Sequence, residues 1–230
     1  MKIFKWIKRV FIGLFVLSIL IVLVYKWIPV PYTGLMLKRF FVNGSNIEKK
    51  WVPIDSMANS IKLAVISSED QKYFQHGGFD FKEIQKIIEK KGTPKRGGST
   101  ISQQTAKNVF LWDGRNYVRK GLEVYFTCLI EWIWGKKRIL EVYLNVIEFG
   151  DGIYGIEFAS QHYFHKPASK LTTSEAATLA ALLPNPREYG KIINGKFIQK
   201  RKLWIMRQMS NLKDTVIFSN YYKLKKTKNA

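Results

Sequence analysis

Residues 97–111 read GGSTISQQTAKNVFL, and this stretch sets the interpretation of the rest of the chain. Thr100 and Gln103 have the Thr-x-x-Gln spacing of a capping box, which predicts that a helix begins directly after Thr100. Backbone N–H groups at a helix N-terminus attract anions, and Gln104 and Lys107 would share one face of the same helix. The stretch therefore predicts a phosphate-type anion site, and the alternative is a capped surface helix.

A second stretch, EDQKYFQH at residues 69–76, lies shortly before the first. Glu69 is expected at the C-terminal end of a helix beside Asp70, where the helix dipole and the second carboxylate both disfavour its ionised form. Such a carboxyl group suits a general base near neutral pH, and the alternative is a solvated helix end. His76 is interpreted as a structural hydrogen-bonding group, because the chain has only three histidines and one cysteine for a zinc site.

A third candidate carboxylate is Glu123, which lies four residues after Arg119 and three after Lys120. The neighbouring cations favour its ionised form, so it suits a fixed charge that positions cations or a metal. The alternative is a surface ion pair of the kind common on helices. Cys128 lies in an apolar run and, as the single cysteine, excludes a disulfide within the chain.

The remaining pattern predicts a mainly α fold, because hardly any run alternates with period two. Asp55 is expected to cap a helix that runs toward Glu69. Residues 92–98 are expected to form a loop, and 150–152 to break the chain. Further helices, with apolar residues every three or four positions, are expected near 81–88, 118–135, 139–144 and 172–184, the last behind a Thr172/Glu175 capping box.

An apolar segment near the N-terminus predicts a membrane anchor. Val10 to Tyr25 contains no charged residue and lies between Arg9 and Lys26. Flanking tryptophans and snorkelling cations extend this short run to the thickness of a bilayer. Basic residues before the segment predict a cytoplasmic N-terminus with the rest of the chain outside. The alternative is a cleaved signal peptide, but no small-x-small cleavage site follows the segment.

The charge balance predicts an anionic partner. The chain has 38 basic and 17 acidic residues, for a net charge of +21, and eleven of the basic residues lie from Lys191 onward. Nucleic acid, anionic lipid or a phosphorylated substrate would satisfy this balance. Export past the membrane argues against nucleic acid.

Four ordered blocks resemble glycosyltransferase family 51. They read AVISSEDQKYFQHGGFD, RGGSTISQQTAKNVFLWDGR, RKGLEVYFTCLIEWIWGKKRILEVYLNVIEFGDGIYGIE and FHKPASKLTTSEAATLAALLPNP, and they cover residues 63–186. Within the family, FLWDGR and FHKPASKLT are similar to the monofunctional peptidoglycan glycosyltransferases of Gram-negative bacteria. The resemblance implies a lysozyme-like α domain with a smaller membrane-associated lobe, behind a single transmembrane helix.

The resemblance also implies a reaction and site residues. The family polymerises lipid II into β-1,4-linked glycan, inverting at C1 of MurNAc and releasing undecaprenyl diphosphate. Glu69 would be the catalytic base and Glu123 the second essential carboxylate. Contacts to the diphosphate and sugars would come from Ser99, Gln104, Lys107, Arg115 and Arg119, with motif support from Asp70, His76, Thr100, Gln103 and Asn108. Three positions depart from the family pattern without touching a proposed catalytic group, namely Tyr73, Ser102 and Gly135.

The implied setting is the inner membrane, with the catalytic domain in the periplasm. The expected partners are lipid II, the growing glycan strand, the membrane and proteins of cell-wall synthesis or division. No cofactor is required by the pattern, although Mg²⁺ or another divalent cation on the diphosphate is plausible chemistry that no residue spacing proves. The expected division is 1–9 cytoplasmic, 10–28 transmembrane, 29–52 linker, 53–190 glycosyltransferase domain and 191–230 basic C-terminal segment.

Two other functions are open at this level. A lysozyme-like domain with acidic residues could hydrolyse finished glycan, although the cluster of basic residues and the GGSTISQQ segment exceed what hydrolysis needs. A membrane-tethered module that binds anionic polymer or recruits division proteins would need no catalytic Glu69. No penicillin-binding domain follows the four blocks, so the resemblance implies no transpeptidase activity.

Overall fold

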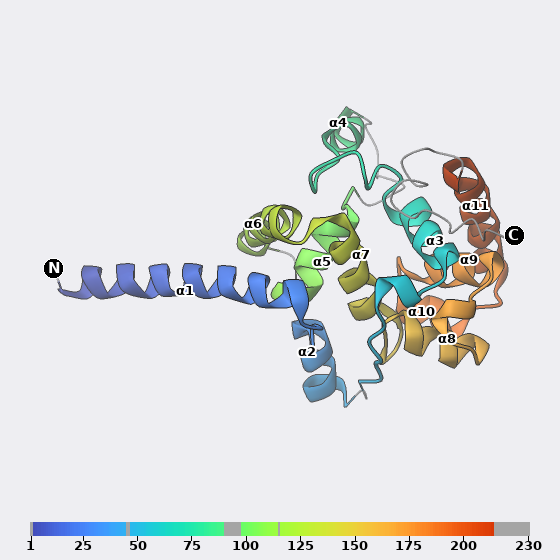
Figure 1. The fold of residues 1–230 in the computed structure, drawn as a ribbon, viewed down its shortest axis with the longest axis horizontal. Helices are drawn as coiled ribbons and strands as arrows, with labels where there is room; N and C mark the ends of the chain where they lie inside the picture. The colour runs from blue at the N-terminus through green and yellow to red at the C-terminus, as the bar shows by residue number, and fades with distance from the viewer. Residues whose placement is uncertain (1, 45–46, 90–97, 115, 214–230) are drawn as a thin grey trace, which may run out of the picture.

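The computed structural model describes residues 2–44, 47–89, 98–114 and 116–213, and most of them are helical (Figure 1). This confirms the predicted mainly α fold. The α-helices are α1 (Lys2–Trp27), α2 (Gly34–Asn43), α3 (Asn59–Glu69), α4 (Phe81–Glu89), α5 (Ile101–Phe110), α6 (Tyr117–Ile133), α7 (Gly135–Val146), α8 (Ile156–Phe164), α9 (Thr173–Leu182), α10 (Pro186–Lys191) and α11 (Lys196–Lys213). The antiparallel strands β1 (Glu148–Gly150) and β2 (Ile153–Tyr154) form a small hairpin, and 3₁₀ helices span Ile54–Ser56 and Ala168–Lys170.

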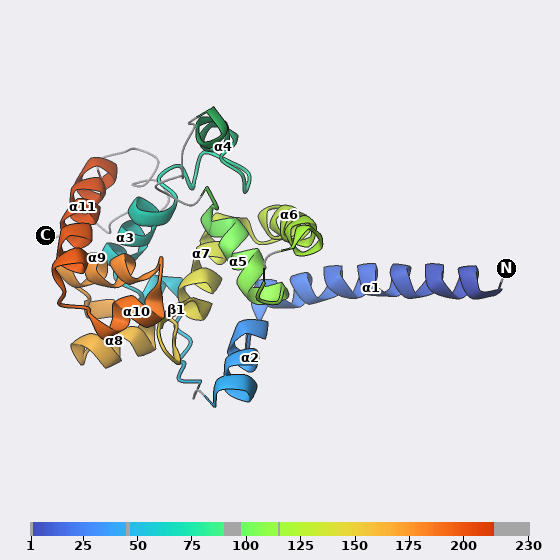
Figure 2. The same cartoon turned by 180° about the vertical axis from the view of Figure 1, so that it is seen from behind.

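Two groups of helices form the body of the molecule. Helix α9 packs against α3 and α11, and α5 packs against α6 and α7. Figures 1 and 2 show the first group at the end of the molecule opposite the projecting α1, with the second group between them. Residues 61–68 of α3 are all buried, so this helix is a fixed support for Glu69 at its end.

Local capping signals were predicted correctly. Thr100 Oγ1 accepts the Gln103 backbone N–H at 3.2 Å, and Gln103 Oε1 accepts the Thr100 N–H at 3.0 Å. The same reciprocal pair joins Thr172 and Glu175 at the start of α9. Each box satisfies backbone donors that the first helical turn leaves unpaired.

The prediction for Asp55 was wrong. Asp55 lies in a separate 3₁₀ turn, in which the Ser56 N–H bonds to Pro53 O at 2.9 Å. Its carboxylate pairs with Lys137 at 2.8 Å, and α3 begins only at Asn59, without a side-chain cap. The short turn after Pro53 therefore separates Asp55 from the helix that it was expected to cap.

The segment expected to be a linker, 29–52, contains a helix. Helix α1 ends at Trp27, before Pro29 and Pro31, and α2 forms a few residues later. Thr33 Oγ1 caps α2 by accepting the Met36 N–H at 3.2 Å. Gly44 ends it in the left-handed region, at φ 63°. The Thr-Gly start and the glycine end were readable signals that the expectation of a linker overlooked.

Helix α1 is the one described helix that is long and apolar enough to cross a membrane. Polar contacts tie its C-terminal half to the body. Ser18 Oγ and Tyr125 OH lie 2.8 Å apart, Trp134 Nε1 donates to Val22 O at 2.7 Å, and Arg138 Nη2 donates to the Ile28 carbonyl at 2.6 Å. The anchor is therefore packed against α6 and the start of α7 rather than joined only through its chain connection.

Some sequence-level expectations lie outside the described residues. The predicted loop at 92–98 is described only at Gly98. The domain limits stay predictions, including the limit at 190. Beyond that limit, α11 packs on α3 and α9 and so contributes to the same helical body.

Candidate functional site

Glu69 is the last residue of α3, and its carboxylate is only 15% exposed. Gln104 Nε2, on α5, donates to Glu69 Oε2 at 3.2 Å. Ser68 Oγ donates to Oε1 at 2.9 Å, and Arg201 Nη2, on α11, lies 3.7 Å from the same oxygen. Side chains from α3, α5 and α11 therefore converge on this carboxylate and hold it in place.

Asp70 fastens the end of α3 to the start of α5. Its Oδ2 accepts the Ile101 N–H at 3.1 Å, and its Oδ1 lies 2.8 Å from His76 Nε2. His76 Nδ1 accepts the Gly78 N–H at 3.2 Å, so the ring proton of neutral His76 lies on Nε2 and is donated to Asp70. Thr100 Oγ1 then closes the network by donating to Gly78 O at 2.6 Å.

This network changes the interpretation of the predicted anion site. The first turn of α5 does receive an anion, but that anion is the carboxylate of Asp70 at the Ile101 N–H. The Gln103 N–H is bonded to the Thr100 hydroxyl. These two backbone donors therefore serve the protein itself, and the backbone phosphate site predicted at this N-terminus is not supported.

Glu123 lies in the middle of α6 under two cations. Arg119 Nη1 donates to Glu123 Oε2 at 2.8 Å, and Lys120 Nζ donates to Oε1 at 2.5 Å. Arg119 Nε also donates to Gly114 O at 2.7 Å. The Glu123 side chain is 4% exposed and the Arg119 side chain 10%, so this is a buried pair and not the surface ion pair of the alternative interpretation.

Helix α5 carries one residue that contacts Glu69 and another that lies near Glu123. Gln104, which contacts Glu69, is followed three residues later by Lys107, about one helical turn along the axis. Partial loss of hydration lowers the pKa of Lys107, Glu123 raises it, and Arg119 lowers it again. The side chain remains exposed at the surface, so we regard the desolvation as partial. Lys107 is thus close enough to Glu123 and Arg119 for their charges to act on its pKa.

Tyr143 fixes the orientation of the Gln104 amide. Its hydroxyl donates to Gln104 Oε1 at 3.1 Å, which turns the Gln104 NH₂ group toward Glu69. Burial raises the pKa of Tyr143 well above its ordinary value, and the nearby Glu69 and Asp70 raise it further. The phenol therefore stays protonated and remains a hydrogen-bond donor.

The structure brings most of the predicted site residues together along α5. Gln104 meets the base, Lys107 lies near Glu123 and Arg119, and the predicted support residues Asp70, His76, Thr100 and Gln103 build the frame. Ser99 and Asn108 are half-buried on either side of this row. Arg115 lies outside the described residues.

Sequence reasoning missed Arg201 and Tyr143. Arg201 lies in the basic segment that was interpreted only through its net charge, yet it reaches Glu69 from α11. No spacing rule links residues this far apart in the chain, so only the packing of α11 on α3 reveals the contact. Tyr143 was assigned to the apolar face of its helix, and nothing in that pattern indicates the use of its hydroxyl.

Two departures from the family pattern make structural contacts on the opposite side of α5. Tyr73 is fully buried, and its hydroxyl donates to Lys136 O at 2.7 Å. Ser102 Oγ donates to Glu131 Oε1 at 2.5 Å, and the same oxygen accepts Lys136 Nζ at 2.6 Å. Ser102, Glu131 and Lys136 thus join α5, α6 and α7, and Tyr73 ties the segment after α3 to α7.

The residues present do not fit a divalent cation held by the protein. Among the described residues, no three His, Cys, Asp or Glu side chains gather as a ligand set. Divalent cations prefer carboxylate oxygens, but both oxygens of Glu123 are already paired, one with Arg119 and one with Lys120. The fixed charges at this position are therefore the side-chain cations, and no step proposed below depends on a metal.

A largely buried carboxylate and a cation cluster thus lie along one helix of a mainly helical fold, an arrangement typical of a transferase site. The family model described as transglycosylase matches residues 34–210, and the chain belongs to this family. It is 46% identical over 230 residues to the biosynthetic peptidoglycan transglycosylase of Escherichia coli, covering 92% of this chain and 93% of the relative.

Two further relatives with the same description come from other bacteria. The protein of Chromohalobacter salexigens is 47% identical over 221 residues, covering 90% of this chain and 94% of the relative. That of Caulobacter vibrioides is 53% identical over 182 residues, covering 78% and 79%. The chain is thus a glycosyltransferase that acts on peptidoglycan, and its apolar N-terminal helix fits a single-pass inner-membrane protein.

Proposed function

We propose that the chain polymerises lipid II into β-1,4-linked glycan strands and releases undecaprenyl diphosphate, with inversion at C1 of MurNAc. The observation that carries this proposal is the row on α5, where Gln104 contacts the Glu69 carboxylate and Lys107, about one turn later, lies near the cations of the Glu123 cluster. A glycosyl donor with a diphosphate leaving group needs a proton acceptor for the attacking hydroxyl and cations for the leaving group.

Glu69 is the proposed base. It accepts the proton of the acceptor 4-hydroxyl while that oxygen bonds to C1 of the MurNAc at the reducing end of the growing strand. The C1–O bond to the diphosphate breaks, and its electron pair leaves with undecaprenyl diphosphate. Because attack comes from the face opposite the leaving group, an α-linked donor gives a β-linked product. The donors from Ser68 and Gln104 hold the carboxylate in its orientation before the proton arrives.

The leaving group is stabilised by cations already fixed in place. Glu123 is the positioning carboxylate, since it holds Arg119 and Lys120 through both of its oxygens. Lys107 extends the positive surface toward Glu69. Preorganised cations stabilise charge as it develops on a departing diphosphate, without a cost of reorganisation during the reaction. Ser99 and Arg115 are the further proposed donor contacts, and Asn108 is proposed as support for the motif.

The setting follows from the anchor and the net charge. The basic residues in the first turns of α1, ahead of its apolar run, favour a cytoplasmic N-terminus, which would put the catalytic domain in the periplasm. A lipid-linked substrate then diffuses in the same membrane. The net charge of +21 favours contact of the protein with the anionic surface of that membrane. Lipid II, the glycan strand and cell-wall synthesis or division proteins are the proposed partners. No transpeptidase step is assigned, because the motifs of this site serve glycosyl transfer.

Purified protein incubated with labelled lipid II in detergent tests the proposal on a gel of glycan products. We expect a ladder of polymers from the wild-type protein and none from folded Glu69→Gln. Shortening of preformed glycan would instead identify a hydrolase. Unchanged lipid II in every lane, with binding to glycan or membrane retained, would identify a non-enzymatic tether and overturn the proposal.

A further inference from the structure

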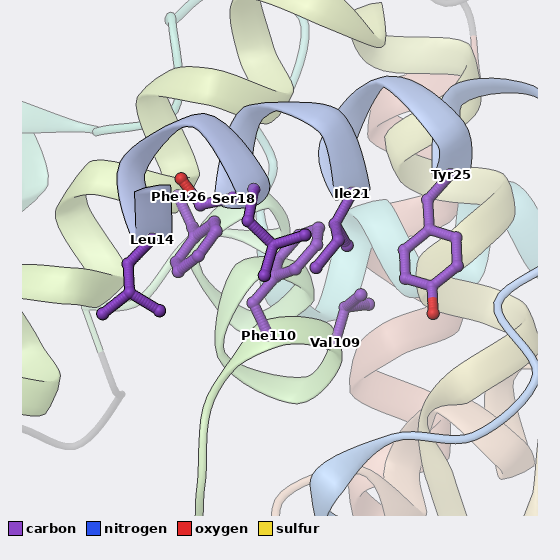
Figure 3. Close-up of a pocket in the computed structure, with 8 residues that line it drawn as sticks. Leu14, Ser18, Ile21, Tyr25, Val109, Phe110 and Phe126 are labelled. Atoms are coloured by element: carbon purple, nitrogen blue, oxygen red, sulfur yellow. The ribbon is translucent and has the colours of Figure 1, made fainter. Parts of the chain in front are cut away.

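An apolar groove of about 300 Å³ lies between the anchor and the catalytic domain (Figure 3). One wall is a single face of α1 from Leu14 to Tyr25, and the facing wall is formed by Val109, Phe110 and Phe126. Figure 3 shows the α1 side chains directed toward these residues of α5 and α6. The glycosyl-transfer step described above uses none of these side chains.

The groove continues directly from the proposed diphosphate region. Phe110 follows Lys107 by three residues on α5, and Phe126 follows Glu123 by three residues on α6. Each helix therefore carries a polar residue of the site and, about one turn later, an aromatic wall of the groove. A molecule with a diphosphate at Lys107 and an apolar chain attached to it would have that chain at the mouth of the groove.

Specific contacts hold the walls of the groove together. The Phe110 and Phe126 rings stack with centroids 4.6 Å apart and an interplanar angle of 7°. Ser18 on α1 lies within hydrogen-bond distance of Tyr125 on α6, at 2.8 Å. Trp134 donates to a carbonyl of α1 at 2.7 Å. Polar bonds of this kind are stable in an apolar environment, so the spacing between α1 and α6 is fixed.

The depth of the groove matches the leaflet that holds the substrate. From Leu14 to Tyr25, α1 rises about 16 Å, roughly half of a hydrocarbon core of about 30 Å. Tyr25 lies next to the end of the apolar segment that leads to the catalytic domain. With the N-terminus in the cytoplasm, the part of this face toward Tyr25 lies in the outer leaflet, beside the tail of a lipid-linked donor.

We propose that the groove binds the diphosphate-proximal isoprene units of the polyprenyl chain on the glycosyl donor. This inference rests on the proposed function. Lipid tails are as apolar as the groove, so the gain over the bilayer is van der Waals fit and not transfer out of water. The branched chain gains this fit because its diphosphate is held about one turn away, whereas an ordinary phospholipid lacks that second attachment.

Photo-crosslinking in phospholipid vesicles tests binding without any transfer reaction. The probe is a polyprenyl diphosphate with a diazirine on its first isoprene units and no sugar. We expect labelled peptides from α1, α5 and α6 around the groove, and loss of label when unlabelled polyprenyl diphosphate is added. A phospholipid with the same diazirine is the comparison. Equal labelling by that lipid, or polyprenyl labelling that is absent from the groove or not competed, would overturn the proposal.

A matched pair of variants links the groove to turnover. Leu17 lines the groove and is 50% exposed, whereas Leu20 lies outside the lining at almost the same depth and is 51% exposed. Leu17→Trp fills the groove, so we expect its KM for a long-chain donor to rise about fivefold, a packing-sized effect. Its kinetics with a short-chain donor, cut to a single isoprene unit that leaves the groove unfilled, should not change, and Leu20→Trp should behave as wild type with both donors.

The two chain lengths separate this inference from the proposed function. Polymerisation of the short-chain donor by Leu17→Trp shows a folded and active transferase whatever the role of the groove. An equal loss with both donors, or an undiminished preference for the long chain, would show that the groove does not bind the tail. Failure of the wild-type protein to polymerise either donor would count against the proposed function, while the crosslinking result would still decide the groove.

Discussion

The two carboxylates of the site are held in opposite ways. Glu69 accepts hydrogen bonds from the neutral groups of Ser68 and Gln104, and the nearest cation, Arg201, lies 3.7 Å away. Glu123 is bonded directly to two cations and is almost fully buried. Glu69 is thus bonded directly to neutral donors, which suits its proposed role as a base, whereas Glu123 is bonded directly to cations, which suits a fixed charge. The environment, not the residue type, separates their roles.

Glu69→Gln should have the largest effect, because it removes the proton acceptor and keeps the size of the side chain. We expect kcat to fall about a thousandfold, the scale of a lost general base. Binding of polyprenyl diphosphate and the thermal midpoint should stay within error of wild type. Single-turnover kinetics with labelled lipid II would measure the loss. A fall of less than about tenfold would show that another group accepts the proton.

Glu123→Gln should damage stability and leaving-group binding together. Arg119 would remain buried without its countercharge, which costs about 3 kcal/mol in comparable buried pairs. We expect kcat/KM to fall about a hundredfold, the scale of losing one preorganised electrostatic contact. The matched control is Glu188→Gln, which breaks the exposed pair with Lys191 and should cost less than about 1 kcal/mol. Similar thermal midpoints for both variants would contradict the distinction between a buried and a surface pair.

Arg201 is the cation that lies beside Glu69, and its contribution can be tested by substitution. Arg201→Met should lower kcat about tenfold, because the Glu69 carboxylate loses a cation that helps to hold it in place. Arg201→Lys should restore part of this loss, because it returns the charge. Asp70 with its partner His76, and Tyr143 on α7, also lie near Glu69, and these variants leave them in place. An equal loss of kcat in Arg201→Lys and Arg201→Met would indicate support of α11 packing alone.

The sequence predicted the local parts of this site well. The capping box at Thr100 involves residues three apart, and the Arg119–Glu123 pair residues four apart, so both follow from helix geometry. The mainly α class followed from apolar spacing in the same way. What the residues alone left open was whether Glu123 is buried, because helical spacing places two groups together without saying what covers them.

Contacts between distant segments were not predictable in this way. Asp70 occupies the first turn of α5 because α3 ends beside it, and this replaced the expected phosphate. Arg201 reaches Glu69 only because α11 packs across α3. Neither contact leaves a periodic signal in one segment. The resemblance to a known family supplied the role of Glu69 without indicating what orients it.

Lys107→Arg tests whether the cation end of α5 limits activity at high pH. Because partial desolvation and Arg119 lower the pKa of Lys107, despite the opposing effect of Glu123, its ammonium loses its proton at a lower pH than an ordinary lysine. Activity that needs this charge should therefore fall as pH rises through that range. An arginine stays charged, so we expect the alkaline fall to move to higher pH with about twofold change at neutral pH. An unchanged alkaline limb in steady-state assays would assign that fall to another group.

Tyr73→Phe should have the smallest effect. It tests whether the contact between Tyr73 and α7 influences the position of Glu69. The change removes one hydrogen bond to Lys136 O and leaves the buried ring, so stability should fall by about 1 kcal/mol. Because Glu69 is oriented by Ser68, Gln104 and Arg201, kcat and the pH profile should not change. Thermal unfolding and steady-state kinetics on the same preparation would decide. A lower kcat with intact stability would mean that the helix junction behind α5 contributes to the position of the base.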